Sequence, residues 1–376
     1  IIASTKVDYK MPKEEALDFS GKSAGICYLP ESIDKLFAEP EEKTKKRVNR
    51  NLESGHFSVF GHPTYNLILE GIPKILAMLL NNEKIYNTSE KSARYTKMKL
   101  SKEEEHLYYK WLNINMELIE KEYPKFEEKK IQKLAQDNAR YLISIFTPAT
   151  IMEYTVSFQQ LNFIIKWFED YIENEPESEF SQKLKKVMKE FLSALPDIKV
   201  EKLNSSIKGT RLSLFAKRQR EEEFGENYCT NYKASFAELA QAQRHRTLAY
   251  EMSLLDKAEY YVPKIIKNTE LEEEWINDIS SLEKLYPQGM LVNINERGTV
   301  ENFVLKCTER LCGAAQLEIM EQTKETLNKY MKAVENQKTI YEYLLPYSNG
   351  ARCTFPGWKC NAPCVFGRKE AMNRKI

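Results

Sequence analysis

Apolar residues recur at helical spacing along four stretches of the chain, which we predict to be helices. These stretches are residues 101–122, 124–145, 158–173 and 302–335. Two short apolar runs, Tyr65–Glu70 and Met290–Ile294, instead have the composition of strands. Pro73 follows the first run closely, and a proline suits the first turn of a helix. We therefore expect Tyr65–Glu70 to be a central strand that leads directly into a helix.

This mixture of long helices and separate strands predicts the α+β class, with antiparallel sheets and long helices. The most polar connection is 174–183, and a second candidate boundary lies near 196–210. After Tyr347 the composition changes again and becomes rich in Gly, Pro and Cys. We predict a first repeat over 1–200, a second over 201–346 and a cysteine-rich tail over 347–376.

Composition narrows the possible classes of protein. With 56 Lys and Arg against 55 Asp and Glu, the net charge is +1, so no bulk charge recruits nucleic acid or a membrane surface. No apolar stretch approaches the roughly 20 residues of a spanning helix, and the opening IIASTKVDYK lacks a signal-peptide core. Seven cysteines without even spacing favour a reducing, cytoplasmic compartment.

The first stretch with chemical interest ends in Glu90-Lys91-Ser92-Ala93-Arg94-Tyr95. Glu90, Ser92 and Arg94 alternate, so in an extended or looped segment they face one side together. A carboxylate, a hydroxyl and a guanidinium on one side suit a nucleotide, since Arg and Ser donate to phosphate oxygens. The same alternation is also typical of a solvated strand edge, and the spacing alone favours that interpretation.

The second stretch is Gln241-Ala242-Gln243-Arg244-His245-Arg246, which follows a helix-like run. Two arginines flank the histidine, and such a cluster of donors can bind a phosphate or polarise an electron-rich ring. A basic helix end that complements its own dipole is the alternative.

Together, the two stretches resemble the signature of the flavin-dependent thymidylate synthases. That signature reads Arg-His-Arg, two residues, Ser, one residue, Asn-Glu, one residue, Ser, one residue, Arg-Tyr. In this chain it is split: the first stretch keeps the end but has Asn82-Glu83-Lys84 in place of Arg-His-Arg, whereas the second keeps Arg244-His245-Arg246 and the preceding Gln241. Asp256-Lys257 stands where its closing Arg-Tyr belongs.

Shorter fragments extend the resemblance over most of residues 20–336. The Ala139-Arg140 pair resembles an Ala-Arg stretch of the family, and Asn295-Glu296-Arg297 resembles an Asn-x-Arg that contacts the adenylate side of the flavin. Arg310, followed by Ala315-Gln316-Leu317-Glu318-Ile319, resembles the C-terminal helix of the family. The resemblance therefore implies two tandem repeats of the thymidylate-synthase-complementing-protein type.

The family builds its site between the subunits of a homotetramer. Two degenerate repeats with complementary remnants imply a composite site, in which one repeat supplies the nucleotide loop and the other supplies Arg-His-Arg. A homodimer would then form a pseudo-tetramer with two complete sites and two blank ones. Changes at Asn82 or Lys84 are expected to matter little, because they lie in a blank copy.

The activity implied by the resemblance is reductive C5-methylation of dUMP, with FAD as cofactor and with NADPH and methylenetetrahydrofolate as co-substrates. The resemblance assigns catalytic roles to Arg310 and Glu90. It assigns the nucleotide to Gln241, Arg244, Glu90, Ser92, Arg94, Arg140 and Arg310. It assigns the cofactor and folate to His56, Ser58, Arg244, His245, Arg246, Asn295 and Arg297.

Several alternatives stay open at this point. Arg140 could instead form an ion pair with Asp137 or Glu153, and His56 and His62 could be core histidines, His62 above all. The product could be another C5 derivative such as a hydroxymethyl nucleotide, or the chain could be a non-catalytic scaffold that binds nucleotide or flavin. Cys353, Cys360 and Cys364 are weak candidates for a metal site, and three buried thiols are the favoured interpretation.

Overall fold

The computed structural model describes residues 11–28, 32–94, 96, 98–204 and 212–376. The opening decapeptide, Tyr95 and part of the expected boundary at 196–210 therefore lie outside the described residues. The chain forms two compact units, each assembled from several segments. Unit one contains Ile1–Gly71, Glu83–Glu90 and Ile151–Leu212, and unit two contains Ile72–Asn82, Lys91–Thr150 and Ser213–Ile376. Among the described residues, no helix is both long and apolar enough to cross a membrane.

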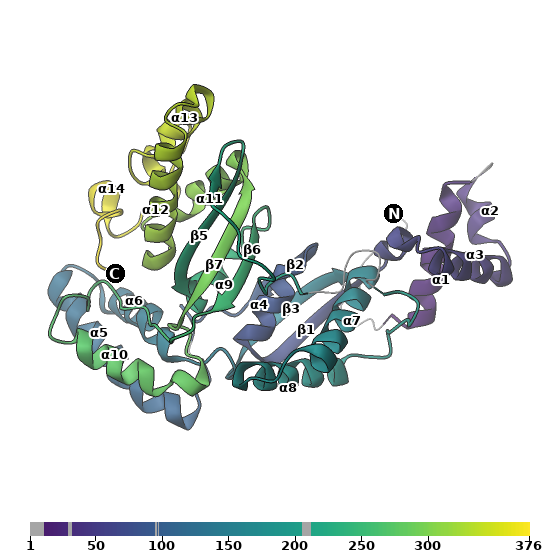
Figure 1. Ribbon diagram of the computed structural model, residues 1–376, viewed down its shortest axis with the longest axis horizontal. Helices are drawn as coiled ribbons and strands as arrows, with labels where there is room; N and C mark the ends of the chain where they lie inside the picture. Colours follow the sequence, from purple (N-terminus) through teal and green to yellow (C-terminus); the bar gives the residue numbers. More distant parts are fainter. Residues whose placement is uncertain (1–10, 29–31, 95, 97, 205–211) are drawn as a thin grey trace. The chain divides into compact units, whose positions relative to one another are not determined.

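Unit one combines a three-stranded sheet with helices (Figure 1). Its helices are α1 (Lys13–Ile26), α2 (Ile33–Phe37), α3 (Glu41–Glu53), the 3-10 helix η1 (Phe57–Gly61), α7 (Phe158–Asn174) and α8 (Glu179–Ala194). Its strands are β1 (Thr64–Pro73), β2 (Tyr86–Glu90) and β3 (Pro148–Ser157), of which β1 and β3 each run across a unit boundary.

The strand order in this sheet is β1-β3-β2. Strands β2 and β3 are antiparallel, with Tyr86 opposite Val156 and Glu90 opposite Met152. The predicted strand and the helix directly after it are confirmed by β1 and α4 (Lys74–Asn82), but the expectation that this strand is central is wrong, because β3 lies between β1 and β2. Side-chain alternation reports which face of a strand is buried and carries no information about its neighbours.

Unit two holds the other elements. Besides α4 its helices are α5 (Lys102–Glu122), α6 (Glu128–Ala139), α9 (Phe236–Ala242), α10 (Glu272–Ser281), α11 (Val300–Arg310), α12 (Leu317–Ala333), α13 (Lys338–Leu344) and α14 (Gly367–Glu370). Its 3-10 helices are η2 (Arg140–Leu142), η3 (Glu283–Leu285), η4 (Leu345–Tyr347) and η5 (Arg352–Thr354). Its strands are β4 (Glu223–Phe224), β5 (Asn227–Ser235), β6 (Ala249–Leu254) and β7 (Leu291–Thr299), in the order β4-β5-β7-β6.

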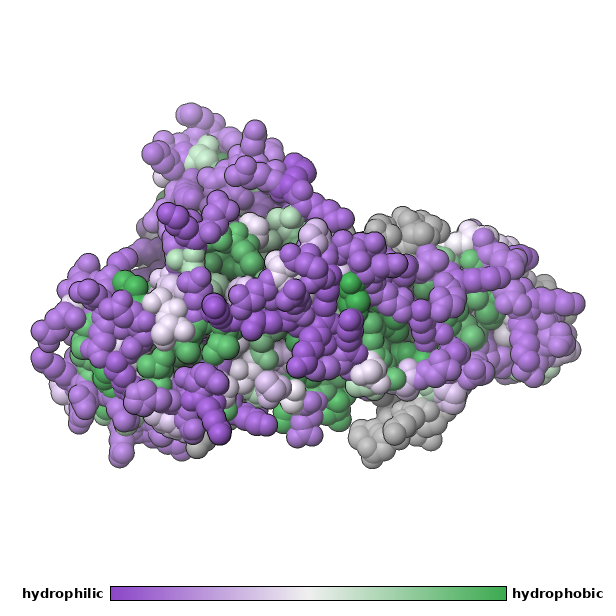
Figure 2. Space-filling model, turned by 60° about the horizontal axis from the view of Figure 1, so that its bottom comes forward, coloured by the Kyte–Doolittle hydropathy of each residue, from purple (hydrophilic) through white to green (hydrophobic). Residues whose placement is uncertain are grey.

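A large aromatic core lies beneath the helical part of unit two. Trp111 of α5 and Trp275 of α10 are both fully buried and meet edge to face, with ring centroids 4.9 Å apart. Tyr141 and Ile266 are buried in the same cluster. Burial of such large side chains supplies most of the driving force for packing these helices. Hydrophilic residues dominate the outer face drawn in Figure 2, in keeping with a chain of 30% charged residues.

The periodicity predicted the helices well except at two places. Helices α5 and α7 match the predicted stretches 101–122 and 158–173 closely. The stretch 124–145 contains the shorter α6 followed by η2, and the stretch 302–335 is two helices, α11 and α12. At the break between α11 and α12, a side chain at Gly313 would come within 2.6 Å of Cys364 Sγ. A glycine is therefore required for this close approach.

The two sheets share their connections as well as their strand order. In unit one the strands β1, β3 and β2 are adjacent in that order, and in unit two β5, β7 and β6 are adjacent in the same order. Strands β1 and β5 each lead directly into a helix, α4 and α9 respectively, and β3 and β7 lead into α7 and α11. The helix after the middle strand has the same kind of N-cap in both sheets. Ser157 Oγ accepts from the backbone N–H of Gln160, and Thr299 Oγ1 accepts from the backbone N–H of Asn302.

Individual backbone hydrogen bonds also recur at matching places. The first amide of α7 donates to Pro63 O over 2.8 Å, and the first amide of α11 donates to Glu226 O over 2.9 Å. Pro63 precedes β1 by one residue, and Glu226 precedes β5 by one residue. Strands β5, β7 and β6 therefore repeat the order and the helix entry of β1, β3 and β2, and β4 is an additional strand of the second sheet.

Candidate functional site

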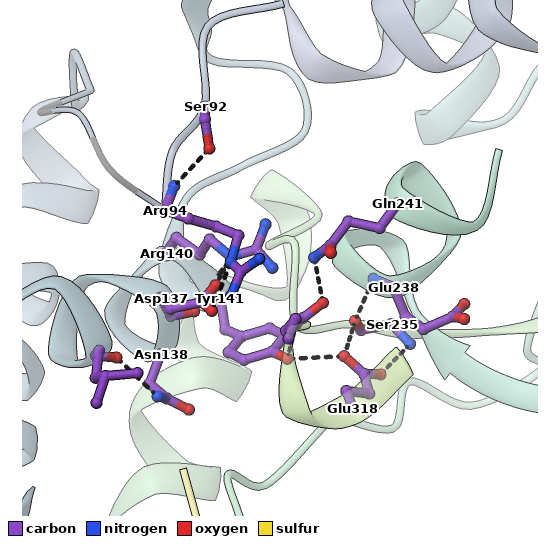
Figure 3. A network of polar contacts seen from close by, with 12 residues as sticks. Ser92, Arg94, Asp137, Asn138, Arg140, Tyr141, Ser235, Glu238, Gln241 and Glu318 are labelled. Atoms are coloured by element: carbon purple, nitrogen blue, oxygen red, sulfur yellow. Dashed lines mark hydrogen bonds and ion pairs between the residues drawn. The ribbon is translucent and has the colours of Figure 1, made fainter. Parts of the chain in front are cut away.

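Two arginines of unit two share a single carboxylate. Arg94 Nε lies 2.7 Å from Asp137 Oδ2, and Arg140 Nε lies 2.9 Å from Asp137 Oδ1 (Figure 3). The sequence left open an ion pair of Arg140 with Asp137 as the alternative to a phosphate-binding role, and this ion pair is present. The Nη2 atom of Arg140 is buried and has no hydrogen-bond partner among the described residues. Two guanidinium groups on one carboxylate leave an excess of positive charge.

The residues before Arg94 form a turn, so Glu90, Ser92 and Arg94 do not share one strand face. Strand β2 ends at Glu90, and the Arg94 amide donates to Ser92 Oγ over 3.3 Å. The Nη2 atom of Arg94 lies 3.4 Å from Ala314 O, in the connection before α12. Arg94 therefore contacts a residue 220 positions further along the chain.

A buried hydrogen-bond network extends from Tyr141 toward α9 (Figure 3). The Tyr141 hydroxyl donates to Glu318 Oε2 over 2.8 Å, and it accepts from the Gln316 amide group. Gln316 in turn accepts from Gln241 Nε2. The other Glu318 oxygen accepts from the Ser235 amide over 2.8 Å. The network thus joins η2, the start of α12, the end of β5 and α9.

The Arg-His-Arg sequence follows α9 and has a buried centre. His245 is 6% exposed, and its Nε2 atom accepts from Arg310 Nε over 2.7 Å. The same guanidinium reaches Gln241 O over 3.4 Å. Burial and then the nearby positive charges of Arg310 and Lys306 lower the pKa of His245 to about 2. His245 is therefore a neutral hydrogen-bond acceptor that orients Arg310.

The two arginines of Arg244-His245-Arg246 lie at the surface, whereas Arg297 forms an ion pair with Glu251. Arg244 and Arg246 are both exposed. Arg297 lies 2.8 Å from Glu251 Oε1 and donates to Asn295 Oδ1 over 3.0 Å. Arg220 pairs with the same Glu251 over 3.0 Å. Hydrogen bonds from both arginines oppose the effect of burial and lower the pKa of Glu251, which stays charged.

The remaining predicted site residues belong to unit one. His56 precedes η1 and Ser58 lies within it, and both are exposed. Glu90 is half-buried at the end of β2. His62 is exposed, so the expectation of a core histidine there is wrong, because the turn after η1 turns its side chain to solvent.

Asn82, at the position of the first arginine of the signature, has a structural role instead. It is 8% exposed, and its Nδ2 atom donates to Ser213 Oγ over 2.7 Å and to Tyr250 O over 3.1 Å. Its Oδ1 atom accepts from Gln243 Nε2 over 2.9 Å. The expectation that Asn82 matters little therefore needs correction: this amide joins α4, residue 213, β6 and the end of α9.

A cavity of about 80 Å³ lies beside the arginine pair. Arg94, Asp137, Tyr141 and Gln316 line it together with residues 313–315. Further basic residues, Lys130, Lys133 and Arg374, also line this cavity. It therefore has basic walls and contacts both the first half-motif and the segment before α12.

The cysteines of the tail do not form a metal site in the described part of the chain. No group of three or more His, Cys, Asp or Glu side chains there is arranged to hold a metal ion. Cys353 and Cys364 are half-buried and Cys360 is exposed, and all three are free thiols. None of the three is fully buried, so the favoured interpretation of three buried thiols is wrong, most clearly for Cys360 at a turn-rich surface segment.

The sequence-based prediction missed four polar residues of this network as site residues: Asp137, Tyr141, Gln316 and Glu318. Asp137 was named only as an ion-pair partner of Arg140, from its position three residues earlier on a helix, and not as a residue that also binds Arg94. Tyr141 and Glu318 are 177 positions apart, and no local signal connects them.

Comparison with known proteins shows the family of the chain. A family model described as thymidylate synthase complementing protein matches residues 10–197, which is half of the 376-residue chain. The chain belongs to this family. It is also 30% identical over 77 residues to the flavin-dependent thymidylate synthase of Clostridium tetani (strain Massachusetts / E88), a match that covers 20% of this chain and 31% of that protein. The family match includes Arg94 and Arg140, while Arg244-His245-Arg246 lies beyond it.

Proposed function

We propose that the protein is an enzyme of the flavin-dependent thymidylate synthase type that methylates dUMP at C5. The observation that carries this proposal is that Arg94 of the first half-motif and Gln241 of the second both contact the segment just before α12 in a single chain. Arg94 and Tyr141 from the first half contact Ala314, Gln316 and Glu318 from the second half directly. Neither half contains the whole signature, so we propose that the two halves together form one nucleotide site.

The matching details of the two sheets support an origin by tandem repetition. A shared strand order, paired helix caps and equivalent hydrogen bonds at Pro63 and Glu226 are all expected of two copies of one fold. The repeats are proposed to span 1–200 and 201–346, followed by the tail over 347–376. The second copy then supplies Arg-His-Arg, while Asn82 in the first copy has become a structural residue.

The arginine pair is proposed to bind the phosphate of dUMP. Arg94 and Arg140 are oriented by Asp137, and the buried Nη2 atom of Arg140, which has no hydrogen-bond partner among the described residues, is a donor for an anionic oxygen. The Ser92 hydroxyl lies beside the Arg94 amide and adds a further donor. A desolvated guanidinium that binds phosphate oxygens gives strong, charge-assisted hydrogen bonds.

Arg310 and Gln241 are proposed to contact the uracil ring. The neutral His245 accepts from Arg310 Nε, and Gln241 O accepts from Arg310 Nη2, so the Nη1 group is proposed to face the base carbonyls. A positive charge there would stabilise the negative charge that develops when C5 acts as a nucleophile. Because burial lowers the pKa of Arg310, an anionic ligand is favoured beside it.

The exposed guanidinium groups of Arg244 and Arg246 fit the diphosphate and ring of a flavin, because both are donors with fixed geometry. The flavin, when bound, would transfer electrons from NADPH to the one-carbon unit. Asn295 and Arg297 are proposed to bind its adenylate side. The roles of His56, Ser58 and Glu90, which belong to unit one, stay predictions from the family resemblance. In the overall reaction, dUMP, methylenetetrahydrofolate, NADPH and a proton give dTMP, tetrahydrofolate and NADP⁺.

The proposal is tested by anaerobic incubation of the full chain with dUMP, methylenetetrahydrofolate, FAD and NADPH, followed by mass analysis of the nucleotide. We expect dTMP from the unmodified chain and none from Arg310→Ala. Arg50→Ala is the matched control, because Arg50 is an exposed arginine on α3. A hydroxymethyl product, or unchanged dUMP from the folded protein, would contradict the proposal.

A further inference from the structure

The cavity beside the arginine pair has many more positive than negative groups. Among the described residues that line it, the basic ones are Arg94, Lys130, Lys133 and Arg374, and the acidic one is Asp137. Its volume of about 80 Å³ is large enough for one phosphate group.

The basic surface continues beyond this cavity. Lys130 and Lys133 of α6 also line a second, wider depression of about 490 Å³. Lys125 and Lys129 lie along that depression, and Glu127 is the acidic residue among the described residues that line it. The two hollows share two lysines, so they form a continuous basic path that leads away from Arg94.

The crowded positive charge is unfavourable without a ligand. Lys130 is half-buried, and its pKa is lowered by burial and then by the positive charges of Arg94 and Lys133. An anion along the path would relieve this repulsion. A single phosphate beside Arg94 and Arg140 would not extend along the second depression, whose basic lining suits a chain of several phosphates.

We propose that the nucleotide site accepts a pyrimidine deoxynucleoside triphosphate, whose β- and γ-phosphates lie along Lys130 and Lys133. This inference rests on the proposed function, because it places the α-phosphate at Arg94 and Arg140. A triphosphate could act there as substrate or as a competing end product, and both uses require the same recognition. Each additional charge-assisted contact is expected to tighten binding by about tenfold.

The test is titration calorimetry of the full chain with dUMP, dUDP, dUTP and inorganic tripolyphosphate, without magnesium. We expect dUTP to bind at least about tenfold more tightly than dUMP, with dUDP between them. In the Lys130→Gln/Lys133→Gln double variant this gain should fall below about threefold, while affinity for dUMP changes by less than about twofold.

The matched control is Lys186→Gln/Lys189→Gln, two exposed lysines with the same spacing of three residues on α8. This variant should keep the full preference for dUTP. Equal affinity for dUMP and dUTP in the unmodified chain would overturn the inference and leave the proposed function intact. The inference would also be overturned if tripolyphosphate bound as tightly as dUTP. Equal loss of dUMP and dUTP binding in the Lys130→Gln/Lys133→Gln variant would overturn it as well. Failure of all three nucleotides to bind would instead contradict the proposed function.

Discussion

The buried, neutral His245 should make the stability of the protein depend on pH. Its pKa is lowered from 6.5 to about 2 in the folded chain, by burial first and then by Arg310 and Lys306. Below its ordinary pKa, the unfolded chain therefore binds a proton that the folded chain does not bind. Stability from this residue is present at neutral pH and is lost as the pH falls below about 6.5.

The size of this effect follows from the two pKa values. Each pH unit below the unfolded pKa costs about 1.4 kcal/mol, so the loss between about pH 8 and about pH 5 is about 2 kcal/mol. Glutamine at this position keeps a hydrogen-bond acceptor for Arg310 but cannot take up a proton. The variant His245→Gln should therefore lose about 2 kcal/mol less than the unmodified chain over the same pH range.

The assay is urea unfolding at both pH values, followed by circular dichroism. His106→Gln is the matched control, because His106 is an exposed histidine of the same unit and its replacement should leave the pH dependence unchanged. If His245→Gln and the unmodified chain lose the same stability on acidification, His245 is not held neutral by burial and Arg310, and the orientation assigned to Arg310 is wrong.

Three further predictions concern residues around the site. Burial raises the pKa of Glu238 to about 8, so the folded chain becomes less stable as the pH rises from about 5 to about 9. In the same unfolding assay, Glu238→Gln should lose about 4 kcal/mol less stability over this pH range than the unmodified chain. Asn82→Ala should destabilise the chain by about 2–4 kcal/mol in thermal unfolding, because it removes buried hydrogen bonds. The control Lys84→Ala should have little effect. Equal effects of the two substitutions would argue against the structural role of Asn82. Co-expressed Arg94→Ala and Arg310→Ala chains should recover no dUMP turnover, because each chain contains one defective half of its own site; recovered turnover would show that the site is built between chains.

The sequence predicted the local elements and both half-motifs, because these depend on neighbouring residues. The apolar period found α5 and α7, and Pro73 correctly indicated a helix directly after β1. The break between α11 and α12 was missed. Gly313 lies in this break and packs closely against Cys364, a contact with a distant part of the chain that leaves no local signal. The position of β1 at the sheet edge was missed for the same reason: strand order is a long-range property.

The candidate site was only partly predictable. The residue types of Arg94, Arg140 and Arg310 indicated an anionic ligand, but the sequence could not show that all three belong to one unit. The burial of His245 between exposed arginines was also unpredictable, because the local pattern Arg-His-Arg reads as a uniformly polar segment. Its environment is set by Arg310, which lies 65 positions away.

The central claim is that each chain contains one complete nucleotide site, assembled from one half-motif of each proposed repeat. The measurement that tests it most directly is the number of dUMP molecules bound per chain, determined by titration calorimetry. The account predicts one site per chain, abolished alike by Arg94→Ala and by Arg310→Ala in chains that remain folded. Two sites per chain, or dUMP binding that survives either substitution unchanged, would contradict it.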